Sequence, residues 1–124
     1  MLKESRAFSG FSVDDIPAAQ RFYGETLGLE VSARGGGLGL QLATGGSVFI
    51  YPKEDHEPAA YTALNFPVAD LEATVDALVE RGVSFERYDG FGQDERGIAD
   101  TPGGGPRIAW FKDPAGNVLS VLSE

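Results

Sequence analysis

The sequence contains no cysteine, and its 124 residues include only one histidine, one tryptophan and one methionine. The lack of cysteine excludes a disulfide framework, a thiolate metal site and a cysteine nucleophile. Basic residues are scarce as well: ten lysines and arginines stand against nineteen aspartates and glutamates, for a net charge of −9. Because nucleic-acid binding requires a basic surface, we expect no nucleic-acid partner.

Long hydrophobic runs are also missing. The opening residues, MLKESRAFSG, contain no apolar stretch of signal-peptide length, and no later run approaches a membrane span. We therefore expect a cytoplasmic protein with no membrane partner. The apolar share of 42% is ordinary, and the length suits a single domain over residues 1–124.

What the sequence does contain is an internal repeat. The segment FSVDDIPAAQRFYGETLGLEV and the later segment FPVADLEATVDALVERGVSF align with an offset of 55 residues. In both, strand-like alternation gives way to helical spacing. Asp15 and Asp70 are placed to cap the helices, and Gly28 and Gly82 to end them. Strands are expected after each glycine, over 29–32 and 83–87.

The repeat continues with an offset of 70, where LGLQLATGGSVFIY aligns with IAWFKDPAGNVLSV. Each of these segments is two apolar runs joined by a glycine-bearing turn, which is typical of a hairpin. The sequence therefore predicts an α+β fold of two tandem βαβββ modules, about 5–57 and 58–124. The second module carries an extra glycine-rich, acidic loop, residues 89–107. Phe91 and Ile98 either anchor it as a lid over the site, or the loop is simply solvated.

The doubled βαβββ pattern, the segment VDDIPAAQRFYGETLGLEV and the terminal WFKDPAGNVLSVL resemble the vicinal oxygen chelate superfamily. That group includes glyoxalase I, bleomycin-resistance proteins, fosfomycin-resistance enzymes and extradiol dioxygenases. The resemblance implies a cupped, mostly antiparallel eight-stranded sheet with the helices outside. It also implies a homodimer, with each cup closed within one chain or completed by exchange of halves. The fold hosts enzymes and non-catalytic binders alike.

The enzymes that the chain resembles hold one divalent metal in the cup, on histidine and glutamate side chains. The resemblance implies that the equivalent positions here are Phe8, Ile50, Ala63 and Ser120. These side chains do not suit a catalytic divalent ion, so we expect no metal and no other cofactor. The only histidine, His56, lies among Glu54, Asp55 and Glu57; we interpret this acidic segment as a connector between the modules rather than a metal cluster.

Strand alternation divides the remaining positions between two faces. The expected cup face holds Phe8, Gly10, Val48, Ile50, Ala63, Asn65, Ser120 and Leu122. The expected helix-covered face holds Phe11, Val13, Phe49, Phe66, Val68, Leu119 and Val121. Only Asn65 and Ser120 on the cup face offer hydrogen-bonding side chains, and this composition is typical of a ligand pocket.

The leading hypothesis is metal-independent binding of a small apolar or aromatic molecule, neutral or cationic, by sequestration of the bleomycin-resistance type. Tyr61 and Tyr88 stand near strand ends as further aromatic side chains. The candidate ligand-binding residues are Phe8, Val48, Ile50, Ala63, Asn65, Phe91, Arg107, Trp110 and Ser120. No catalytic residue is assigned.

Two other hypotheses stay open. One is a lyase or isomerase of the glyoxalase and dioxygenase type, using the loop carboxylates Asp94, Glu95 or Asp100, or an atypical metal site. A carboxylate with a raised pKa in the cup would favour it. The other is a module that acts only through protein contacts, with its cup filled by its own side chains.

Overall fold

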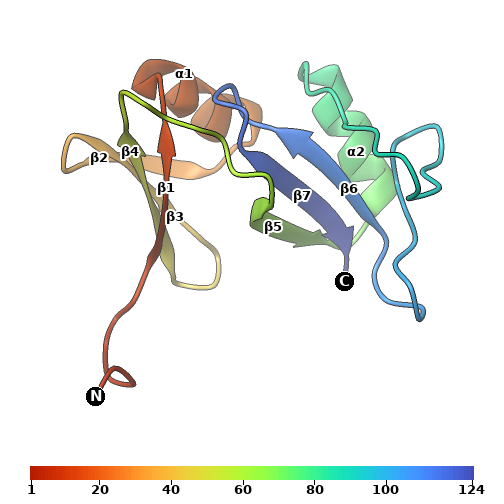
Figure 1. Cartoon of the computed structure of the whole chain (residues 1–124), viewed down its shortest axis with the longest axis horizontal. Helices are drawn as coiled ribbons and strands as arrows, with labels where there is room; N and C mark the ends of the chain where they lie inside the picture. Colours follow the sequence, from red (N-terminus) through yellow and green to blue (C-terminus); the bar gives the residue numbers. More distant parts are fainter. The chain divides into compact units, whose positions relative to one another are not determined.

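The computed structural model describes residues 1–124, which divide into two compact units, Met1–Glu57 and Pro58–Glu124 (Figure 1). Each unit has its own sheet, with a helical segment packed on one face. The α+β class and the tandem arrangement of two modules are as predicted. Neither unit contains a helix with the length and apolar character needed to cross a membrane.

The first unit has the complete βαβββ order. Its elements are β1 (Ser9–Val13), α1 (Ile16–Gln20), η1 (Arg21–Thr26), β2 (Glu30–Arg34), β3 (Gly37–Gln41) and β4 (Ser47–Pro52). In the sheet the strands lie in the order β1-β4-β3-β2, with β1 parallel to β4 and the other pairs antiparallel. The parallel pair at one edge requires a crossover, which the helical segment supplies.

The helical segment begins where the sequence predicts. The Asp15 carboxylate accepts a hydrogen bond from Ala18 N at 3.0 Å, and Gly28 ends the segment with a φ of 74°. From Arg21 the helix widens into the π-helical turn η1, which propensity and periodicity did not predict. Tyr23 in this turn is fully buried, with its ring centroid 6.0 Å from that of Phe11 on β1.

The second unit repeats this topology with one strand reduced. Its elements are β5 (Thr62–Val68), α2 (Leu71–Glu80), β6 (Ile108–Lys112) and β7 (Val118–Ser123), in the sheet order β5-β7-β6. The strand expected over 83–87 is only an isolated bridge, Phe85 to Phe111. Beyond the bridge, the Gln93 side chain occupies two backbone groups that strand pairing would use. Its amide nitrogen donates to Glu86 O at 2.8 Å, and its amide oxygen accepts from Tyr88 N at 2.6 Å.

The core of the second unit lies between α2 and one face of its sheet. The Asp70 carboxylate caps α2 through Ala73 N at 3.0 Å, and Gly82 follows the helix with a φ of 93°. The buried apolar side chains of this core are Leu71, Val75, Leu78, Ala109, Phe111, Leu119 and Val121. Leu119 and Val121 are therefore helix-facing, as the alternation predicted.

On β4 the predicted alternation assigned side chains to the wrong faces. Val48 and Ile50 were expected on the cup face, and the structure corrects this. Ile50 pairs with Phe11, whose ring contacts Tyr23, and Val48 pairs with Leu40. Val48 and Ile50 are buried on the helix-covered face, at 2% and 0% exposure. Phe49 instead lies on the open face, where its ring stacks on that of Tyr51.

The pairing shows the reason for this error. Phe66, equivalent to Phe11 by the offset of 55, pairs with Val121, so Val121 and Ile50 are the equivalent residues. The hairpins are thus offset by 71 residues rather than 70. Because side chains alternate with a period of two, a shift of one residue exchanges the two faces of a strand.

Candidate functional site

Three side chains form a row across the open face of the second unit, the face away from α2. Trp110 on β6 pairs with Ser120 on β7, and Ser120 pairs with Asn65 on β5. Ser120 is fully buried, and its hydroxyl donates to Asn65 Oδ1 at 2.5 Å. The Asn65 amide nitrogen keeps both of its N–H donors for a ligand, because no protein acceptor bonds it.

Aromatic side chains gather at the Trp110 end of this row. The Trp110 centroid lies 5.2 Å from that of Phe91 and 5.6 Å from that of Tyr88, and the Tyr88 and Phe91 centroids are 6.0 Å apart. A hollow of about 250 Å³ opens beside them. It is lined by Ala60, Tyr61, Thr62, Tyr88, Phe91, Trp110 and Val118. We call it the aromatic pocket.

Two of these rings are displayed to solvent. Phe91 is 51% exposed and Tyr61 is 73% exposed, although both are large apolar side chains. Burying such surface is favourable by roughly 25 cal/mol per Å². Burial raises the pKa of the Tyr88 hydroxyl, so Tyr88 is neutral at pH 7.

The loop that carries Phe91 is folded rather than loose. The Asp94 carboxylate accepts from Arg96 N and Ile98 N, each at 2.9 Å, and the Gln93 amide donates to Gly97 O at 2.8 Å. Ile98 is 4% exposed, and Ala99 next to it bridges Ile108. Residues 93–99 therefore fix one end of the loop to the sheet, next to the aromatic pocket.

The structure moves one predicted residue out of this site and replaces it with a neighbour. The pairing of β5 with β7 shifts between Thr62 and Leu64, so Ala63 is the unpaired residue of a bulge. The bulge interrupts the alternation, and Thr62, not Ala63, lines the aromatic pocket.

Arg107 also lies elsewhere. Its guanidinium donates two hydrogen bonds, of 2.8 and 2.9 Å, to the carboxylate of Glu72 on α2. It therefore serves the helix-covered face and not the aromatic pocket. These bonds hold the pKa of Glu72 at about 2, against an ordinary 4.5.

This ion pair predicts an acid-sensitive part of the stability. Because the folded-state pKa of Glu72 is depressed, its contribution is complete above about pH 4.5 and is lost as the pH falls towards 2. Glu72→Gln should therefore lower the free energy of unfolding at pH 7 but flatten its pH dependence between 4.5 and 2. Urea unfolding at pH 7, 4.5 and 2.5 measures this. An unchanged slope, or an equal change in Glu80→Gln on the same helix, would contradict the assignment.

The remaining candidate, Phe8, lies on the first unit and is 56% exposed. The Arg34 guanidinium carbon stands 4.7 Å from the Phe8 centroid and 5.6 Å from that of Phe49. With the corrected offset of 71 residues, the first-unit counterpart of Ser120 is Phe49 rather than Ile50. The family resemblance therefore assigns that metal-ligand position to Phe49. Neither the arginine over two phenylalanine rings in the first unit nor the Ser120–Asn65 pair in the second supplies a donor set for a divalent cation.

The acidic connector likewise shows no converging ligands. His56 Nδ1 and Ser12 Oγ share a hydrogen bond of 2.6 Å, while Asp55 forms an ion pair with Lys53 at 2.8 Å. No three His, Asp or Glu side chains come together anywhere in the chain in a way that would hold a metal ion.

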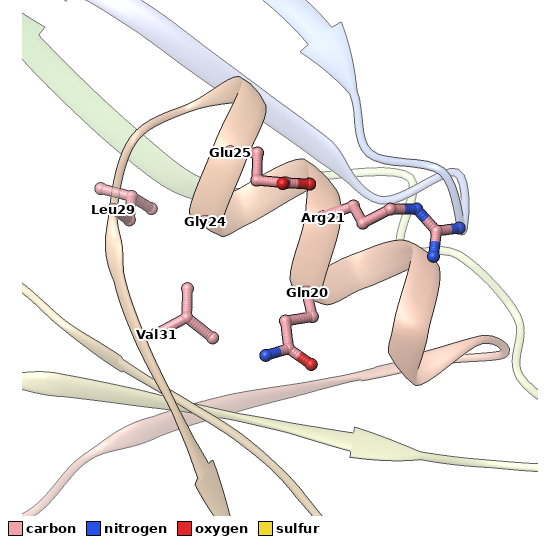
Figure 2. A pocket seen from close by; sticks show the side chains of 6 residues that line it. All are labelled: Gln20, Arg21, Gly24, Glu25, Leu29 and Val31. Carbon is pink, nitrogen blue, oxygen red and sulfur yellow. The ribbon is translucent and has the colours of Figure 1, made fainter.

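A second hollow, of about 340 Å³, lies beside η1 on the first unit (Figure 2). Half-buried Leu29 and Val31 come from the strand side, and the exposed Gln20, Arg21 and Glu25 come from the helix. It holds no aromatic ring and no buried polar group, so the aromatic pocket is the stronger candidate for a ligand.

The carboxylates of the loop do not form an acid–base pair at the pocket. The Asp94 carboxylate is engaged by backbone N–H groups, and the Glu95 side chain is 85% exposed. Asp100 is exposed as well. None of the three lines the aromatic pocket.

Comparison with known proteins gives a family. The sequence model of the Glyoxalase/Bleomycin resistance protein/Dioxygenase superfamily matches residues 8–121. No curated protein sequence matches the chain significantly.

Solved structures of this kind share the fold. A glyoxalase family protein from Enterococcus faecalis is 20% identical, with a TM-score of 0.73 over 98% of this chain and 99% of that one. An antibiotic binding protein from a Streptomyces species is 28% identical, with a TM-score of 0.66 over 94% of each chain. A fosfomycin resistance protein from Listeria monocytogenes is 12% identical, with a TM-score of 0.71 over 95% and 91%.

Proposed function

Because the chain belongs to the glyoxalase/bleomycin resistance protein/dioxygenase superfamily, we propose that it binds a small planar aromatic molecule in the aromatic pocket and sequesters it without chemistry. The observation that carries the proposal is the aromatic cluster of Trp110, Tyr88 and the half-exposed Phe91, at one end of a row of side chains that reaches the Asn65 amide through Ser120. Flat aromatic surfaces stack on such rings, and the amide orients a polar edge of the guest.

Sequestration is favoured over catalysis by the side chains that the pocket lacks. A general acid or base works best with a pKa near the operating pH. The titratable groups lining the pocket are the phenols of Tyr61 and Tyr88, and burial raises the pKa of Tyr88 further from that range. The likeness to an antibiotic binding protein supports a role in capturing a small molecule of that kind.

Charge favours a neutral or cationic guest over an anionic one. The chain carries a net charge of −9, and the exposed Asp89 follows Tyr88 directly on the loop. A field of this sign concentrates cations near the surface. A cation also gains from the electron-rich faces of Trp110 and Tyr88.

Isothermal titration calorimetry with proflavine, a planar cation, and acridone, its planar neutral counterpart, tests the proposal. We expect saturable binding of both, unchanged by EDTA, with proflavine the tighter. Trp110→Leu should weaken binding at least about fivefold, because one aromatic stacking contact contributes roughly 1–3 kcal/mol. Phe91→Ala should act in the same direction.

The matched control is Tyr51→Ala, which removes an exposed aromatic side chain of the first unit and should leave binding within twofold. Equal binding by the Trp110→Leu variant and the unaltered protein would refute the site. Conversion of either probe during incubation, followed by mass spectrometry, would favour the enzyme hypothesis instead.

A further inference from the structure

A second set of side chains, on the first unit, has the features of a binding site for an anion. Arg34, the last residue of β2, projects from the open face of the sheet, where Nη1 donates to Ser47 Oγ at 3.4 Å. Its guanidinium lies over the rings of Phe8 and Phe49. Two aromatic rings and one hydroxyl thus hold the group in place.

This arginine has no carboxylate partner. Acidic residues outnumber basic ones nineteen to ten, and Arg96 and Arg107 both form ion pairs with aspartate or glutamate. None of the protein's ion pairs includes Arg34, and its contacts are those with Ser47 and the two rings. A guanidinium carries five N–H donors in a planar fork, so most of them stay available to a ligand.

Arg34 borders a hollow of about 250 Å³ on the same face. The hollow is lined by Ser32, Arg34, Gly39, Leu40, Gln41 and Ser47. Gly39 leaves room for this arrangement, because an added Cβ would stand 3.2 Å from Arg34 Cδ and 3.4 Å from Ser32 Oγ and would push these side chains aside. The glycine therefore lets the Arg34 side chain pass across β3. The hydroxyl groups of Ser32 and Ser47 line the same hollow.

The geometry points to a site for the carboxylate of a small aromatic acid; we call it the Arg34 site. The planar guanidinium matches a carboxylate in two parallel hydrogen bonds, and Ser32 and Ser47 supply hydroxyl donors beside it. The rings of Phe8 and Phe49 offer apolar surface for the aromatic part of the acid. A single cation in a chain of net charge −9 suits a monoanion better than a phosphate dianion.

Titration with benzoate, followed by the Arg34 Nε–H signal in NMR spectra, tests the proposal. We expect a saturable shift of that signal, at least about tenfold weaker binding of the neutral benzyl alcohol, and no shift with inorganic phosphate. Arg34→Gln should weaken benzoate binding at least about tenfold, and Arg34→Lys, which keeps the charge but loses the fork, should fall between the two.

Two further variants separate geometry from charge. Gly39→Ala leaves the charge unchanged but crowds Arg34, so benzoate binding should weaken. Arg21→Gln removes the same charge from the helix of the same unit and should stay within twofold. Equal benzoate binding by Arg34→Gln and the unaltered protein, or phosphate binding as tight as benzoate, would overturn the Arg34 site.

The Arg34 site is built from residues of the first unit and the aromatic pocket from residues of the second, and the variants test the two separately. Benzoate binding that depends on Arg34 should survive in Trp110→Leu, and proflavine binding that depends on Trp110 should survive in Arg34→Gln. If benzoate binding does not depend on Arg34 while proflavine binding depends on Trp110, the Arg34 site has failed. The reverse result means that the aromatic pocket has failed.

Discussion

Replacing Gly37 by alanine is expected to destabilise the protein by about 3 kcal/mol, the largest effect of any single methyl group added to this chain. Gly37 begins β3 and pairs with Arg34 on β2. A Cβ at this position would overlap the carbonyl oxygen of Ile50, with the Ile50 carbonyl carbon at 3.1 Å and Tyr51 Cα at 3.2 Å. These are backbone atoms of β4, so no side chain can rotate away, and the two strands must separate.

The measurement is urea unfolding followed by circular dichroism, with Gly46→Ala as the matched control. Gly46 lies in the turn before β4, and the nearest atom to an added Cβ is Thr44 Oγ1 at 3.5 Å, an ordinary contact. Its replacement should change the free energy of unfolding by less than about 0.5 kcal/mol. A Gly37→Ala variant as stable as the control would show that β3 and β4 are not packed as described.

Removing the carboxylate of Asp113 should destabilise the second unit by about 3 kcal/mol as well. Asp113 is 4% exposed and accepts hydrogen bonds from Ala115 N at 3.0 Å, Asn117 N at 2.8 Å and Asn117 Nδ2 at 3.0 Å. Asp113→Ala leaves these donors without that acceptor, and an unsatisfied buried donor costs about 1–3 kcal/mol.

The turn matters for the site because it joins β6, which carries Trp110, to β7, which carries Ser120. Thermal unfolding of Asp113→Ala should show a clear loss of stability, while Asp89→Ala, in the exposed loop, should unfold as the unaltered protein does. If the two variants proved equally stable, the turn would not be the structural support described for the aromatic pocket.

Much of the fold follows from local chemistry that a sequence displays directly. Asp15 and Asp70 cap the helices, and Gly28 and Gly82 end them with positive φ angles of 74° and 93°. These are short-range effects: each aspartate bonds a backbone N–H three residues away, and each glycine adopts its positive φ locally, so spacing alone identifies them. The repeat of such signals in the same order predicted the two modules.

The errors have a different origin, since each depends on contacts between segments distant in the chain. The offset of 71 rather than 70 is visible only in the pairing of Phe66 with Val121, and it reversed the faces of β4. The bulge at Ala63 and the reduction of strand 83–87 to a bridge depend on β7 and on the Gln93 side chain. No periodicity within one segment contains that information.

Only part of the candidate site was predicted, because it too depends on contacts between distant segments. Ser120 and Asn65 were placed by alternation, Trp110 was named only as an aromatic candidate, and the structure brings the three into one row. Arg34 was not identified from the sequence, where it is only a basic residue before three glycines. Its importance appears once Phe8 and Phe49 are seen to flank it.

Binding of a planar aromatic guest beside Trp110 can be followed at the tryptophan itself. Because the chain has a single tryptophan, its indole N–H gives one signal in a nitrogen–proton correlation spectrum. During titration with proflavine, we expect this signal and the Asn65 side-chain amide to shift together and saturate at the calorimetric affinity. Saturable proflavine binding that leaves both signals unmoved would contradict binding beside Trp110.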